Sequence, residues 1–133
     1  MAYSNLEFSG RFARIHDLDL SIACFLVIEL GSRVGSSFLD DMFEAWVDSI
    51  SNSGSGCIDL QLDKFLKSQE RVGLIIRLID LVIRDLESMS EVFPREKLNS
   101  MLVGVKIKLD VDYRVGLIIG ALIGLRKIII GEG

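Results

Sequence analysis

This chain has few of the residues on which enzymes and metal sites usually depend. Its 133 residues include one histidine, two cysteines and one proline. His16 adjoins Asp17 and lies close to Asp19, but one imidazole with carboxylates on the same short segment is a poor metal site. The sequence contains no P-loop, no dinucleotide-binding glycine motif and no nucleophile elbow. We therefore expect no metal, no cofactor and no enzymatic activity.

The first residues also lack a basic segment followed by an apolar run, which is the pattern of a secretory signal. Cytoplasmic location is then the default, and cysteines in the cytoplasm are kept reduced. Cys24 and Cys57 have no metal-ligand spacing. We expect both to be free thiols in a cytoplasmic protein, with a disulfide between them as the open alternative.

An excess of basic residues, which nucleic-acid binding needs, is missing as well. The net charge is −4, and residues 1–66 hold ten acids against four bases. Residues 67–133 hold nine acids and eleven bases. An acidic half repels a phosphate backbone and attracts a basic protein. The charge balance therefore argues against a nucleic-acid partner and favours a basic protein partner.

The apolar runs of this chain are too short to span a membrane. Residues 115–125 read VGLIIGALIGL without a break and are followed by Arg126 and Lys127. A bilayer requires about 20 residues. A helix that is apolar all round must be buried by the rest of its protein. We predict a central helix over 111–130 that is capped by Asp110 or Asp112 and ends at Gly131.

Residues 38–50 form the clearest amphipathic segment. At 100° per residue, the apolar side chains fall on one arc and the acids on the opposite arc. Trp46 lies at the centre of the apolar arc, so we assign it to the core. The acidic arc consists of Asp40, Asp41, Glu44 and Asp48.

Three further segments are predicted to be helical. Residues 18–30 lie between Asp17, a good N-cap, and Gly31, with a strand as the alternative. Residues 59–65 lead into a helix over 71–89. Residues 94–109 form the last of the three, although 105–109 alternate and allow a short strand.

These segments predict an all-α fold, a compact bundle of about five helices around the apolar C-terminal helix. A hydrophobic fraction of 50% supports one core, and we treat residues 1–133 as a single helical domain. The first fifteen residues are expected to add a helix or turn, with Ser4-x-x-Glu7 resembling a capping box.

Several residues of the two most apolar helices invite specific predictions. Asp85 falls among leucines on the helical wheel, so we expect it to be buried and paired with Arg114 or Arg126. Gly116, Gly120 and Gly124 repeat every four residues and predict close packing inside the bundle. The hexapeptide Arg-Val-Gly-Leu-Ile-Ile occurs at 71–76 and 114–119, which predicts two core helices whether or not a duplication produced it.

No resemblance to a known family guides the functional interpretation. The acidic arc is either a solvated face or a docking ridge. We favour a non-enzymatic protein-binding module that neutralises a basic partner, such as a toxin or enzyme, in the manner of immunity proteins. A secretion chaperone or adaptor is the first alternative, and a membrane-associated protein using residues 115–130 is the second. The partner, the oligomeric state and the presence of a pocket stay open.

Overall fold

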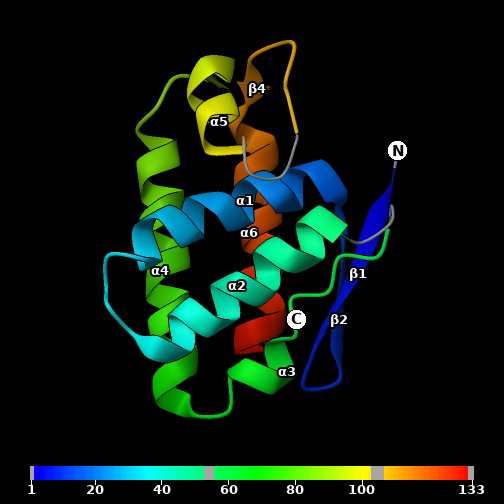
Figure 1. Cartoon of the computed structure of the whole chain (residues 1–133), viewed down its shortest axis with the longest axis vertical. Coiled ribbons are helices and arrows are strands. Elements are labelled where there is room, and N and C mark those ends of the chain that lie inside the picture. The colour runs from blue at the N-terminus through cyan, green and yellow to red at the C-terminus, as the bar shows by residue number, and fades with distance from the viewer. Residues whose placement is uncertain (1, 53–55, 103–106, 132–133) are drawn as a thin grey trace.

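The computed structural model describes residues 2–52, 56–102 and 107–131, and these form a mostly helical fold with two small antiparallel sheets (Figure 1). The prediction of an all-α fold is therefore wrong. The elements, in chain order, are β1 Tyr3–Phe8, β2 Arg11–His16, α1 Asp17–Gly31, α2 Ser37–Asn52, α3 Leu62–Phe65, α4 Gln69–Glu87, β3 Val92–Phe93, α5 Arg95–Leu102, β4 Tyr113–Arg114 and α6 Val115–Ile130.

The first sheet is a hairpin in place of the predicted helix or turn. β1 pairs antiparallel with β2, from Tyr3 opposite His16 to Phe8 opposite Arg11. Burial alternates along β1, which is the period of a strand and not of a helix. Ser9 and Gly10 connect the strands with φ values of 53° and 78°. Two residues with positive φ make the turn that matches the twist of a hairpin, so the expected capping box does not form.

Residues 18–30 are helical, as predicted, and the strand alternative is wrong. However, Asp17 is the first residue of α1, and His16 occupies the N-cap position without a side-chain cap bond. The Asp17 carboxylate instead accepts hydrogen bonds from Ser4 Oγ at 2.6 Å and from the Gly56 amide at 2.8 Å. This carboxylate joins the hairpin, α1 and the segment after α2.

α6 lies in the middle of the fold, against α1, α4 and β2 (Figure 1). Ile118, Leu122 and Leu125 on its inner side are fully buried. The helix ends at Gly131 in the left-handed conformation, as predicted. No helix formed by the described residues is long and apolar enough to cross a membrane.

The start of α6 differs from the prediction. Tyr113 and Arg114 pair with β3 before the helix begins at Val115. Neither predicted aspartate caps α6, because the Asp112 carboxylate accepts a hydrogen bond of 3.0 Å from the Arg95 amide at the start of α5. The aspartate therefore supports the neighbouring helix instead of its own.

α5 is shorter than the predicted helix over 94–109. It ends at Leu102, and residues 107–109 are neither helix nor strand, while 103–106 lie outside the described residues. The Asn99 side chain accepts from the Leu109 amide at 2.6 Å and donates to the Leu109 carbonyl at 3.0 Å. The Asn99 side-chain amide therefore bonds the N–H and C=O groups of Leu109, which in a longer helix would bond to other backbone groups of that helix.

The region predicted as 59–65 and 71–89 contains two separate helices. α3 occupies only Leu62–Phe65, and Ser68 begins α4 by accepting a hydrogen bond of 3.1 Å from the Arg71 amide. Most of each copy of the repeated hexapeptide lies in α4 or in α6. The prediction of two core helices is therefore confirmed, while the duplication stays a prediction.

The buried ion pair predicted for Asp85 does not form. Asp85 is exposed. Arg126 instead donates to Asp80 at 2.7 Å, with both side chains partly exposed. On the helical wheel Asp85 lies at the edge of the apolar arc of α4, and that edge borders solvent instead of the core.

Candidate functional site

The acidic arc of α2 is an outward-facing surface of the protein. Asp40, Asp41, Glu44 and Asp48 are all exposed, and we call these four residues the acidic face. The span from Asp40 to Asp48 is about 12 Å along the helix axis. The opposite side of α2 is buried by Leu39, Met42, Phe43 and Trp46. The expected separation of acids from apolar residues is therefore present in the structure.

The inner side of α2 holds this face firmly. Trp46 is fully buried, as predicted, and its indole Nε1 donates to the Leu60 carbonyl at 2.9 Å. The rings of Phe43 and Trp46 meet edge to face with centroids 5.4 Å apart. α1 ends against the Phe43 ring, because a Cβ added to Gly31 would lie 2.6 Å from Phe43 Cζ. Such packing leaves little freedom for α2 to move.

The charges of the acidic face are not neutralised within the described part of the chain. α2 contains no lysine, arginine or histidine. The ion pairs among residues 2–52, 56–102 and 107–131 involve none of the four acids. Arg71 reaches α2, but its guanidinium stacks on the Phe38 ring at 4.7 Å and donates to the Phe65 carbonyl. The four carboxylates therefore present their charge to solvent.

α6 carries a second distinctive outer surface, which the sequence interpretation placed in the core. We call it the glycine face. Leu117 is 45% exposed and Ile123 is 41% exposed. A Cβ added to Gly116 or Gly120 would meet no atom of the described residues within 4 Å, so the predicted packing of these two glycines inside the bundle is wrong. The glycine face consists of Gly116, Leu117, Gly120, Ile123, Gly124 and Lys127.

A groove of about 500 Å³ runs beside the glycine face, between α6 and β2. The three glycines line it on α6, and Gly124 comes closest to β2, since an added Cβ would lie 3.4 Å from Ile15 Cδ1. At one end the Tyr113 hydroxyl donates to the Asp19 carboxylate. Burial first, and then Asp19, raise the pKa of Tyr113 above its ordinary value.

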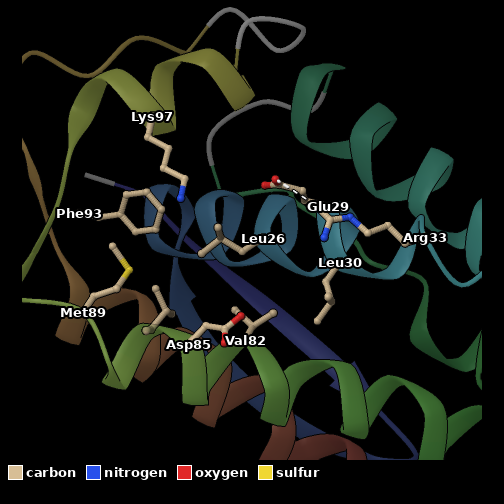
Figure 2. A pocket seen from close by; sticks show the side chains of 10 residues that line it. Leu26, Glu29, Leu30, Arg33, Val82, Asp85, Met89, Phe93 and Lys97 are labelled. Atoms are coloured by element: carbon tan, nitrogen blue, oxygen red, sulfur yellow. Dashed lines mark ion pairs between the residues drawn. The ribbon is translucent and has the colours of Figure 1, made fainter.

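A smaller cavity of about 170 Å³ lies between α1, α4 and the start of α5 (Figure 2). Leu26, Leu30 and Val82 line its apolar part, and charged side chains stand at its rim (Figure 2). Glu29 and Arg33 on that rim pair with each other at 3.8 Å. Sites for small ligands usually occupy about 300–1,000 Å³. This cavity is too small to suggest a substrate site.

The remaining chemistry is sparse in the described ranges. No group of three or more histidine, cysteine or acidic side chains there could hold a metal ion. Cys24 is buried, which raises its thiol pKa, and Cys57 is exposed; neither forms a disulfide. His16 lies at the N-cap position of α1 and meets the Tyr3 ring edge to face, with the ring centroids 5.2 Å apart. None of these residues forms a recognisable catalytic arrangement.

Comparison with known proteins adds no functional assignment. No protein-family model, no curated protein and no solved structure matches this chain. The candidate sites are therefore the acidic face, which the sequence predicted, and the glycine face, which it did not. The sequence signal for the glycine face was the four-residue spacing of its glycines. Such spacing indicates close packing against another helix but does not say which helix that is.

Proposed function

We propose that this protein is a non-enzymatic, cytoplasmic protein-binding module that inhibits a basic protein partner. The single observation that supports the proposal is the acidic face, where four exposed carboxylates stand on one rigid helix without a base among them. Four like charges within two helical turns repel one another by tenths of a kcal/mol per pair. A cationic partner relieves that repulsion when it binds.

The mode of action that fits best is that of an immunity-type inhibitor. A basic enzyme or toxin gathers cationic side chains around the site where it holds an anionic substrate. A fixed row of carboxylates can cover such a site without conformational change, and charge complementarity raises the rate of association. The buried Trp46 anchor supplies the rigidity that this mode needs.

The test is a pull-down from host lysate with three tagged baits. The first bait is the wild type, and the second carries Asp41→Lys, Glu44→Lys and Asp48→Lys. The matched control carries Glu7→Lys, Glu70→Lys and Asp85→Lys, which change the net charge equally at exposed positions outside α2. Captured proteins are eluted with rising salt and identified by mass spectrometry.

We expect one stoichiometric basic protein on the wild type and on the control, released by salt. The α2 variant should lose at least about tenfold in affinity for it while its thermal stability stays equal or rises slightly. Full retention by the α2 variant would exclude the acidic face as the docking site. Equal loss in both variants would show that net charge matters and the position of the charges does not.

A second candidate function, a chaperone or adaptor for another protein, is favoured by one observation. The exposed leucine and isoleucine of the glycine face offer an apolar surface of the kind that a client protein covers. The same pull-down separates the two functions. A client bound to the apolar surface resists high salt, whereas a partner on the acidic face is released by it.

A further inference from the structure

The glycine face is not adapted to water. At 100° per residue its six positions fall on one arc of about 120°. Lys127 is the one charged residue on that arc, and Leu117 and Ile123 are exposed large apolar side chains. Helix faces that contact water in globular proteins normally carry polar residues. This face therefore resembles an interface more than a free surface.

The glycines support this interpretation, because no contact with the described residues explains why Gly116 and Gly120 are glycines. Gly116 and Gly120 sit inside a regular helix, and a Cβ at either position meets empty space. Glycine is among the residues that least favour a helix. Spacing by four residues on one side allows the backbone of a second helix to approach closely. The neighbouring groove of about 500 Å³ leaves room for the incoming side chains.

We propose that the glycine face binds a second copy of this chain, with the two α6 helices antiparallel about a twofold axis. An axis between Gly120 and Ile123 places each Ile123 over the partner's Gly120. The exposed isoleucine then fills the space that the missing glycine side chain leaves. A twofold interface of this kind uses the same surface on both subunits, so one mutation alters it twice.

Charge complementarity selects the antiparallel arrangement. The same axis places Lys127 opposite the partner's Gly116, near the start of the helix. A hollow there is lined by Glu87 and Glu91, together with Arg114. Two acids against one base make this end attractive to a lysine. A parallel pair would bring the two Lys127 side chains together, which like-charge repulsion disfavours.

Dimerisation through this face leaves the acidic face free. The inner side of α6 packs on α1, and α1 in turn packs on α2. Figure 1 shows α1 and α2 on the same side of α6. The acidic face lies on the side of α2 opposite its buried residues, so it points outward. The dimer would present two acidic faces and bind two basic partners.

The first experiment measures the oligomeric state of the full chain by sedimentation equilibrium without detergent. Gly120→Arg places a long charged side chain at the centre of the interface, where an added Cβ meets none of the described residues within 4 Å. Gly73→Arg is the matched control, because Gly73 is also an exposed helical glycine with nothing within 4 Å, but it lies on α4. We expect a wild-type dimer, a dimer of Gly73→Arg, and a dissociation constant raised about tenfold or more in Gly120→Arg.

The second experiment tests the orientation of the two helices. Lys127→Glu should weaken the dimer, and adding Glu87→Lys and Glu91→Lys should restore it. Lys127→Glu that dimerises as well as wild type overturns the antiparallel arrangement. A wild type that is monomeric at every concentration overturns the proposal as a whole. If that monomer floats with phosphatidylcholine vesicles, the glycine face binds a lipid surface instead.

Discussion

The outer faces of α2 and α6 are opposite in character although both helices support the same core. α2 presents four carboxylates to solvent and buries Trp46 completely. α6 presents glycines and two large apolar side chains to solvent, and buries aliphatic residues on its inner side. On α2 every large apolar side chain is buried or half-buried by the described chain. On α6 it covers one side only. An apolar helix can therefore carry more apolar surface than the rest of its own domain buries.

The largest effect is expected from removing the anchor under the acidic face. Trp46→Ala deletes a fully buried indole and its hydrogen bond to the Leu60 carbonyl. Truncating a buried aromatic residue costs about 3–5 kcal/mol of unfolding free energy. Urea denaturation followed by circular dichroism measures it. Phe12→Ala, at a position 68% exposed, is the control and should change stability by less than about 0.5 kcal/mol.

The close approach between α1 and α2 should be the next most sensitive point. Gly31→Ala places a Cβ 2.6 Å from Phe43 Cζ and 2.7 Å from Phe43 Cε2. Overpacking of this kind destabilises by about 1–3 kcal/mol. The same denaturation experiment measures the loss. A variant as stable as wild type would show that Phe43 can shift without cost, and that α2 is held less firmly than its contacts indicate.

The corresponding change on α6 should have the opposite sign. The Cβ of Gly120→Ala meets none of the described residues within 4 Å, so the variant gains helix propensity without a clash among them. The gain expected is about 1 kcal/mol. It should appear at protein concentrations below dimerisation, while the dimer weakens because the helices can no longer approach as closely. Loss of stability in the dilute protein would place Gly120 in a contact within the chain and contradict the open glycine face.

The smallest effect concerns Tyr113 beside the groove. Its raised pKa means that the folded protein holds the hydroxyl proton more tightly than the unfolded chain does. This contribution to stability is complete below the unfolded pKa of about 10 and is lost as the pH rises above it. Tyr113→Phe should therefore show a shallower loss of unfolding free energy between pH 9 and pH 11 than wild type. Parallel slopes would show that the Tyr113 hydroxyl proton does not contribute to the pH dependence of folding.

The comparison of the two helices also shows what sequence patterns can predict. The acidic face followed from a 3.6-residue period, because acids and apolar residues on α2 separate onto opposite arcs. The glycine face could not be predicted in this way. Hydropathy indicates that α6 must be buried, but not how much of its surface the other elements bury. That quantity depends on how α1, α4 and β2 arrange around it.

Two other errors have different physical causes. The hairpin had a readable signal, namely Ser9-Gly10 after the alternating residues Leu6, Glu7 and Phe8, but its first strand also matched a capping box. α5 ends early because the Asn99 side chain bonds the backbone of Leu109. These two hydrogen bonds join residues ten apart in the sequence, and no local sequence pattern predicts them.

One contact between distant parts of the chain determines when folding can finish. The Arg11 guanidinium donates to the carbonyls of Ile128 at 2.7 Å and Ile129 at 3.1 Å. The ribosome synthesises the hairpin residues long before it adds residue 129. During synthesis the hairpin therefore lacks the contact between Arg11 and the end of α6. Contacts of such sequence separation slow folding. The last turn of α6 is therefore secured only after translation has passed it, and the nascent chain depends on its other contacts until then.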